Sequence, residues 1–358
     1  MLSRLFQQVV LICMVANPIT SMASLCLPGA CSTAKSVGEL QVAVDLLKDG
    51  QFAKAETAFK KLLSHTNQND ILYSADVLNY VGVSLHAQKK ENEAERFLEL
   101  ALAKLAPLDR KRKLMRAKVL ANLAGVYSAQ RKTAQALKAL EQSTNLFREA
   151  GNCPKELAVA LVSYGNLELA RHHFAAAEKF FFESIGLREK TSGKNSIELV
   201  SPMVNLSSVY LEQKEYLKAE QLCLRTISIC EASAGKQSAL LFPLFSNLAE
   251  VQKEQNKMTA ALLSLKQALN VAEINFGEKS EEFLASLLSL SEAAEACGQR
   301  ELSLHSMKRA VEICRSNFGP QDERFLLAAE ALADLEQVHG NVAEAQRLRT
   351  LCRISRRR

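Results

Sequence analysis

Apolar positions recur along most of the chain at the spacing of one helix face, and the faces come in pairs. Residues 204–211 place Leu206 and Val209 on one face of a predicted helix. A polar turn at Lys214 follows, and residues 216–231 repeat the apolar pattern in a second amphipathic helix. The pattern predicts hairpins of two antiparallel helices that bury their apolar faces against each other.

The hairpins repeat at a nearly fixed interval. A column of small residues recurs every 39 to 42 positions: Ala55, Ala94, Ala136, Ala177, Ala219, Ala261, Ser303 and Ala345. Two helices approach closely only where one side chain is short, so we expect each of these residues at a helix crossing. Eight repeats therefore lie in register between about Val37 and Cys352.

The residues predicted to end one hairpin and to begin the next recur at the same interval. Five glycines follow one another at intervals of 42 residues: Gly151, Gly193, Gly235, Gly277 and Gly319. Each follows a second helix, where the left-handed backbone conformation suits glycine. Three residues later stand Ser196, Ser238, Ser280 and Asp322, which are good N-cap residues. The first two repeats have no glycine in register.

The central repeats resemble the tetratricopeptide repeat. The resemblance rests on NLSSVYLEQKEYLKAEQLCLRTISI at 205–229 and NLAEVQKEQNKMTAALLSLKQAL at 247–269, and the 42-residue spacing is similar to the kinesin light chain type. Glu91, Thr133 and Arg300 depart from that family, which has an aromatic or apolar residue where the second helix begins. The expected fold class is all-α, a right-handed superhelical α-solenoid of about eight antiparallel helix pairs with the first helices on the concave side.

The ends of the chain differ from the repeats. Residues 1–23 combine a short basic start, the apolar run Val9 to Ala16 and small residues before Ala23, which predicts a cleaved signal peptide. A buried N-terminal helix is the alternative, and acylation of Cys26 or Cys31 fits the neighbouring residues badly. We expect a flexible linker at 24–36, the solenoid at 37–352 and a basic tail at 353–358, in an exported protein, periplasmic or secreted, or else a cytoplasmic one.

No catalytic or cofactor motif emerges from the sequence. The remaining cysteines are interpreted as small apolar core residues, because Cys223 and Cys230 are about 10.5 Å apart along one helix, too far for a disulfide. His172-His173 lacks a third ligand and falls in a predicted turn, so no metal site is expected. We expect no enzyme activity and no cofactor.

A basic cluster at 110–118 and the arginines of the tail are better explained as solvated surfaces than as a nucleic-acid site. Neither has interleaved aromatic residues, and the chain has no Trp and a net charge of only +6.

The resemblance also implies a binding surface. In the resembled family, the column that contains Asn122, Asn205 and Asn247 faces the concave side, where asparagine contacts the backbone of a bound peptide. One helical turn places Asn166 on the same face. The carboxamide suits this role because it both donates and accepts hydrogen bonds. Neighbouring residues would then set specificity: Lys118, Ser208, Glu212, Glu250 and Glu254. The alternative is that these asparagines bond to adjacent helices and fix the stacking.

These expectations define a non-enzymatic scaffold that binds a peptide or helix of a partner protein in its groove. An intracellular adaptor whose basic patch contacts nucleic acid or acidic partners is the alternative.

Overall fold

The computed structural model describes residues 34–66, 70–105 and 109–357 of the chain, and this part is all-α. It divides into two compact units, which we call the N-terminal unit (residues 34–194) and the C-terminal unit (residues 195–357). The predicted signal peptide, Cys26 and Cys31 lie outside the described residues.

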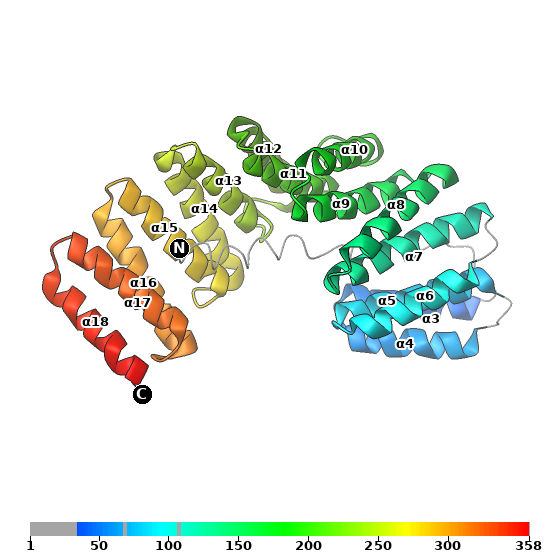
Figure 1. The fold of residues 1–358 in the computed structure, drawn as a ribbon, viewed down its shortest axis with the longest axis horizontal. Helices are drawn as coiled ribbons and strands as arrows, with labels where there is room; N and C mark the ends of the chain where they lie inside the picture. The colour runs from blue at the N-terminus through cyan, green and yellow to red at the C-terminus, as the bar shows by residue number, and fades with distance from the viewer. Residues whose placement is uncertain (1–33, 67–69, 106–108, 358) are drawn as a thin grey trace. The chain divides into compact units, whose positions relative to one another are not determined.

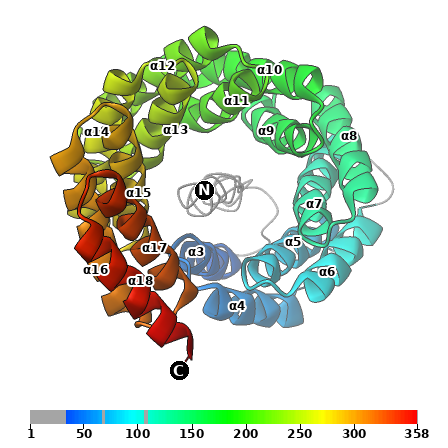
Figure 2. The ribbon, with the colours of Figure 1, turned by 60° about the vertical axis from the view of Figure 1, so that its left-hand side comes forward.

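Each unit is a row of antiparallel helix pairs (Figure 1). The N-terminal unit contains α3 (Ala34–Lys48), α4 (Phe52–His65), α5 (Ile71–Ala87), α6 (Glu91–Lys104), α7 (Arg110–Ala129), α8 (Thr133–Ala150), α9 (Pro154–Ala170) and α10 (Phe174–Ser192). Within this unit, the first helices α5, α7 and α9 lie on the concave side and the second helices α6, α8 and α10 on the convex side (Figure 2).

The C-terminal unit has the same organisation. It contains the short 3-10 helix η1 (Ile197–Leu199), α11 (Val200–Glu212), α12 (Tyr216–Ala234), α13 (Leu241–Glu254), α14 (Met258–Phe276), α15 (Glu281–Ala296), α16 (Arg300–Phe318), α17 (Glu323–Val338) and α18 (Val342–Arg357). Across the described residues, the sixteen α-helices form eight sequential pairs, which confirms the predicted α-solenoid and its eight repeats.

The small-residue column lies at the helix crossings, as predicted. Every member is fully buried, at 0% exposure: Ala55, Ala94, Ala136, Ala177, Ala219, Ala261, Ser303 and Ala345. The turns between pairs also follow the prediction, since Gly193 and Gly235 follow α10 and α12 with φ values of 89° and 87°. A side chain would be strained there, which explains glycine at this point of the repeat.

The structure shows a second small column, on the first helices, that the sequence analysis missed. Gly82 faces Leu98, and Gly165 faces Phe181 so closely that an added Cβ would lie 2.6 Å from the ring. The later repeats have Ser or Ala at this position, among them Ser207. Each pair is therefore closely packed from both sides.

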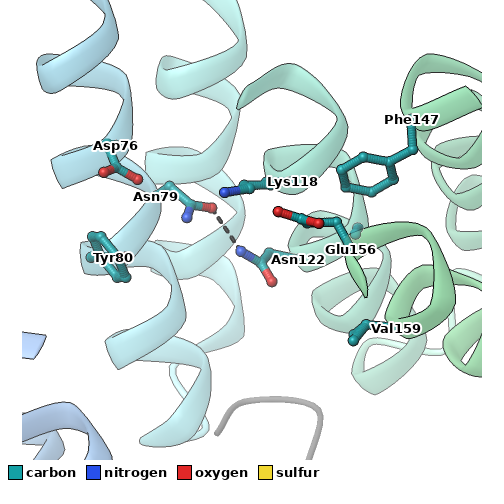
Figure 3. Close-up of a pocket in the computed structure, with 9 residues that line it drawn as sticks. Asp76, Asn79, Tyr80, Lys118, Asn122, Phe147, Glu156 and Val159 are labelled. Atoms are coloured by element: carbon teal, nitrogen blue, oxygen red, sulfur yellow. Dashed lines mark hydrogen bonds between the residues drawn. The ribbon is translucent and has the colours of Figure 1, made fainter. Parts of the chain in front are cut away.

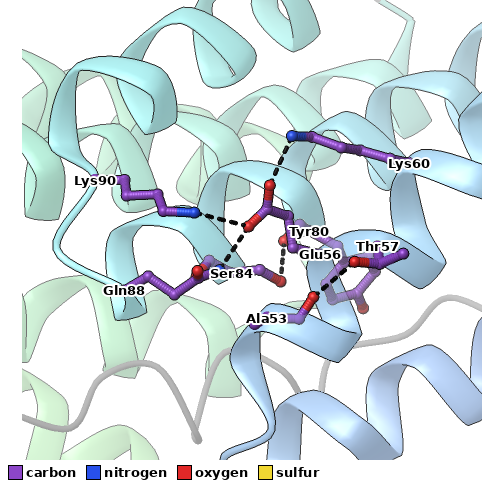
Figure 4. A network of polar contacts seen from close by, with 8 residues as sticks. All are labelled: Ala53, Glu56, Thr57, Lys60, Tyr80, Ser84, Gln88 and Lys90. Atoms are coloured by element: carbon purple, nitrogen blue, oxygen red, sulfur yellow. Dashed lines mark hydrogen bonds and ion pairs between the residues drawn. The ribbon is translucent and has the colours of Figure 1, made fainter.

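Polar bridges join successive repeats at the turns. The Glu56 carboxylate on α4 accepts hydrogen bonds from Lys60 at 2.6 Å and Gln88 at 2.7 Å, and Lys90 lies 3.4 Å away (Figure 4). Burial raises the pKa of Glu56, but these donors outweigh that effect and hold it below its ordinary value. Gln and Lys at the same turn positions bind Glu95 through Gln130 and Lys132, and Glu220 through Gln255 and Lys257.

The helices extend beyond the predicted solenoid limits. The first described helix begins at Ala34, within the predicted linker, because Ala34 to Ser36 contain no helix breaker. The last helix continues to Arg357 through the predicted tail, where arginines suit the negative end of the helix dipole. No helix in the described part of the chain is long and apolar enough to cross a membrane.

Candidate functional site

A pocket lies between the first helices of the N-terminal unit, where α5, α7 and α9 meet (Figure 3). The space among its lining atoms, open solvent included, is about 350 Å³. It is lined by Asp76, Asn79, Tyr80, Lys118, Ala121, Asn122, Phe147, Glu156 and Val159. The concave curvature of three successive repeats thus brings charged, amide and aromatic side chains together.

Two asparagines cross-link the first helices at this pocket. The Asn122 side-chain nitrogen donates a 2.8 Å hydrogen bond to Oδ1 of Asn79 on α5. This bond uses one donor of Asn122 and the oxygen of Asn79. The two remaining polar atoms, Nδ2 of Asn79 and Oδ1 of Asn122, make no hydrogen bond to the described residues. The pair therefore presents a donor and an acceptor to the pocket, which is the combination that a peptide group needs.

An acid and a base occupy the same repeat position in neighbouring helices. Asp76 on α5 and Lys118 on α7 are 42 residues apart. Lys118 is 7% exposed, and its charge favours the ionised form of Asp76. Burial dominates nonetheless and raises the pKa of Asp76 from 3.8 to about 6. The Asp76 side chain is half-buried, but the surrounding helices exclude most of the water that would hydrate its carboxylate.

The predicted groove residues of the N-terminal unit are Lys118, Asn122 and Asn166. The pocket brings the first two together, and Asn166 is half-buried on α9 but does not line it. The bond from Asn122 to Asn79 fits the alternative that asparagines fix helix stacking, while the free donor and acceptor leave the pair able to bind a peptide.

The C-terminal unit carries the other predicted residues on two first helices. Asn205, Ser208 and Glu212 follow one face of α11; Asn205 is only 6% exposed and has an interaction of its own. The Ser208 hydroxyl donates to the carbonyl of Val204 at 3.3 Å, and Glu212 is exposed.

On α13, Asn247, Glu250 and Glu254 follow the corresponding face. Asn247 is half-buried, Glu250 pairs with Lys253 at 2.9 Å, and Glu254 accepts a 3.2 Å hydrogen bond from the Tyr216 hydroxyl. The acidic groups predicted to set specificity here are thus already partnered.

Sequence reasoning missed Asp76, Asn79 and Glu156. A signal existed for Asp76, because it shares the repeat position of Lys118, which the sequence analysis had named. Asn79 lies one residue before the asparagine column and Glu156 seven residues before it, so only the packing of three helices shows that they meet.

The remaining candidate chemistry is structural. Arg110 donates to the carbonyl of Ala150 at 3.0 Å, and Lys113 pairs with Glu149 at 2.9 Å, so part of the basic cluster holds α7 against α8. His172 and His173 are exposed in a turn, and among the described residues no group of three or more His, Cys, Asp or Glu side chains could hold a metal ion.

The cysteines have the environment expected of core residues. Cys153, Cys223, Cys230, Cys314 and Cys352 are buried and form no disulfide with one another, and Cys297 is half-buried. Burial raises the pKa of Cys223 and Cys314 to about 11, so both thiols stay protonated near neutral pH and are poor nucleophiles.

Repeated antiparallel pairs with small residues at their crossings define a helical-repeat protein that offers a surface for binding. The model of the MalT-like TPR region matches residues 84–277, more than half of the chain. The chain belongs to this tetratricopeptide repeat family, whose domains generally bind proteins. The comparisons identify a repeat region and no catalytic domain. No curated protein matches the sequence.

Solved structures share the fold at low sequence identity. BtubC (BKLC) from P. vanneervenii is 16% identical with a TM-score of 0.57, over 64% of this chain and 91% of that one. A putative kinesin light chain repeat protein of Podosopora anserina is 17% identical with a TM-score of 0.51, over 57% and 96%. A STAND protein with a tetratricopeptide repeat sensor, PH0952 from Pyrococcus horikoshii, is 13% identical with a TM-score of 0.64, over 85% and 44%. The kinesin light chain-like neighbours agree with the resemblance seen in the repeats.

Proposed function

We propose that the chain is a non-enzymatic scaffold that holds an extended segment of a partner protein against its first helices. The observation that carries this proposal is the Asn79–Asn122 pair, which presents an amide donor and an acceptor on the concave side of the N-terminal unit. Amide pairs recognise main chain rather than a particular side chain. Membership of a protein-binding repeat family supports the same function.

A displayed library of random heptapeptides, selected on the full chain, tests the proposal. Selected peptides should bind the chain and lose about five- to tenfold in affinity when Asn122 is replaced by alanine, because one amide pairing is lost. Asn145→Ala is the matched control, since Asn145 is exposed on the second helix α8. A library without selectable binders, or equal affinities for both variants, would contradict the proposal.

The predicted residues belong to the proposal as further peptide contacts, each within its own unit: Asn166 in the N-terminal unit, and Asn205, Asn247, Ser208, Glu212, Glu250 and Glu254 in the C-terminal unit. Asn247→Ala is the informative substitution among them, because Asn247 is half-buried whereas Asn205 is buried. A selected peptide that contacts α13 should bind Asn247→Ala more weakly, while the melting midpoint of the variant protein stays unchanged.

Export is a second part of the proposal, supported by the sequence of residues 1–23. A fusion of residues 1–40 to a reporter enzyme should carry the reporter out of the cytoplasm. Retention of the fusion in the cytoplasm would instead favour the intracellular adaptor. The bonds of Arg110 and Lys113 to the neighbouring helix reduce the basic surface that such an adaptor would offer to nucleic acid.

A further inference from the structure

Two carboxylates in the pocket of the N-terminal unit have no hydrogen-bond donor of their own. Asp76 and Glu156 both line the pocket and are both half-buried. Neither makes a hydrogen bond or an ion pair with any residue in the described part of the chain. Partly buried carboxylates are normally paired, because ionised oxygens lose hydration that only donors or positive charges replace. This pocket therefore lacks part of its electrostatic complement.

Lys118 supplies only one of the positive charges that the pocket needs. It projects from α7, between the helices that carry the two carboxylates (Figure 3). With one ammonium group against two carboxylates, the pocket is left with a net charge of about −1 when all three groups are ionised. Burial raises the pKa of Asp76, and the charge of Lys118 does not bring it back to its ordinary value. Lys118 therefore compensates the buried carboxylates only in part.

The neutral walls suit a cation as well. Tyr80 and Phe147 line the pocket, and aromatic rings accept alkyl stems and positively charged heads of basic side chains. Asn79, which lines the same pocket, is 5% exposed, and its side-chain nitrogen is hydrogen-bonded to no described residue. A buried amide with an unused donor beside two unpaired carboxylates indicates a site made for a ligand that brings both an acceptor and a positive charge.

A charged residue at the repeat position of Asp76 and Lys118 is confined to these two repeats among those compared. The position shared by Asp76 and Lys118 is uncharged in the five following repeats, where it holds Val159, Ser201, Pro243, Ala285 and Leu327. A requirement of the repeat fold would recur in every pair. The charges of Asp76 and Lys118 are therefore a property of this pocket and not of the helix packing.

We propose that the pocket between α5, α7 and α9 binds a basic side chain, arginine or lysine, of the segment held against the first helices. The Asn79–Asn122 pair then binds a peptide group beside that side chain, and Asp76 and Glu156 bind its charged head. The inference rests on the proposed peptide-binding function and deepens it, since it assigns the chemistry of one residue of the partner.

Selection of the same heptapeptide library on three forms of the full chain tests the assignment. The pocket variant is Asp76→Asn with Glu156→Gln, which keeps the shapes and removes both charges. The matched control is Asp49→Asn with Glu93→Gln, which removes two charges at exposed positions of the same unit that do not line the pocket. Arginine or lysine should be enriched at one peptide position with the wild-type and control proteins and not with the pocket variant.

A substitution cycle then isolates the pairing. In a selected peptide, replacement of the basic residue by neutral citrulline or norleucine should reduce affinity for the wild-type chain about tenfold, the size expected for a charge-assisted hydrogen bond. The same replacement should change affinity for the pocket variant by less than about threefold. Equal effects on both proteins would overturn the inference.

The outcomes of the selection separate the two proposals. Peptides that bind without basic enrichment, and still depend on Asn122, would overturn the basic-residue assignment while the scaffold function stands. A library that yields no binder for any form would overturn the scaffold function and the inference with it.

Discussion

The N-terminal and C-terminal units build the same helix pair with different side chains at its crossing. In the N-terminal unit, Gly165 leaves room for the large ring of Phe181, and Gly82 leaves room for Leu98. In the C-terminal unit the corresponding first-helix residue is Ser207, and the facing residue is the smaller Cys223. The larger first-helix residue thus faces the smaller second-helix residue, as close packing favours.

The two units differ more in the partners of their carboxylates than in the packing of their helix pairs. In the C-terminal unit, buried Glu336 pairs with Lys308 at 2.8 Å, and Glu295 lies 2.9 Å from the His339 ring. In the N-terminal unit, Asp76 and Glu156 have no such partner among the described residues. Glu336 and Glu295 thus have internal ion-pair partners, whereas Asp76 and Glu156 have none among the described residues.

Deletions in the C-terminal unit should show the largest effects. Removal of the complete 42-residue repeat 205–246 should leave a shorter folded protein, because the apolar faces on either side of the deletion are equivalent. Removal of α12 alone should unfold more helix than it deletes, since α11 and α13 lose the surface between them. Far-UV circular dichroism measures both losses.

The N-terminal pocket provides the control for these deletions. Its lining residues all belong to the other unit, so peptides selected on the full chain should still bind the protein that lacks 205–246. Equal loss of helix in the two deletion proteins would contradict the assigned repeat boundaries.

Much of this organisation could be predicted from the sequence, because its signals recur every 42 residues. The columns of Ala219 and Gly193 correctly placed helix crossings and helix ends. The pocket could not be predicted in the same way. Glu156 comes from α9 and Asp76 from α5, and no period relates them, so their proximity depends on how three first helices curve together.

The crossing residues should give the next largest effect. Gly165→Ala places a Cβ 2.6 Å from the buried Phe181 ring, which cannot move aside. The clash exceeds the gain in helix propensity, so we expect a loss of about 2 kcal/mol in unfolding free energy, measured by urea denaturation. Ser207→Ala should cost less than about 1 kcal/mol, because it removes only a hydroxyl bonded to Val204.

A second substitution distinguishes overpacking from other causes. Phe181→Leu in the Gly165→Ala background should restore part of the lost stability, since it removes the ring that clashes. If Gly165→Ala and Ser207→Ala cost the same, the proposed difference between the crossings is wrong.

The carboxylates should respond to pH with opposite signs. Burial raises the pKa of Asp76 to about 6, so its folded form holds a proton that the unfolded chain, at 3.8, has lost. Stability from this group is present below pH 4 and lost as pH rises through 6. Asp76→Asn should therefore stabilise the protein by about 1 kcal/mol at pH 7 and leave it unchanged at pH 3.5.

Glu336 should behave in the reverse manner. Burial alone would raise its pKa, but hydrogen bonds from Lys308 and Asn341 hold the pKa below the ordinary 4.5. Its stabilising effect is present above pH 4.5 and lost as pH falls through the lowered value. Glu336→Gln should cost about 1 to 2 kcal/mol at pH 7 and much less in acid. Urea midpoints that move in the same direction for both variants would contradict the difference between the units.

The turn bridges should give the smallest effect, and an equal one in both units. Lys132 binds Glu95 at 2.8 Å in the N-terminal unit, and Lys257 binds Glu220 at 2.7 Å in the C-terminal unit. Both lysine side chains are partly exposed, at 38% and 45%, so Lys132→Met and Lys257→Met should each lower stability by about 0.5 kcal/mol, and molar salt should screen most of that loss. Gln130 and Gln255 remain as donors to the same carboxylates in either variant. A loss several times larger in one unit, measured by urea denaturation with and without salt, would show that the turn bridges also differ between the units.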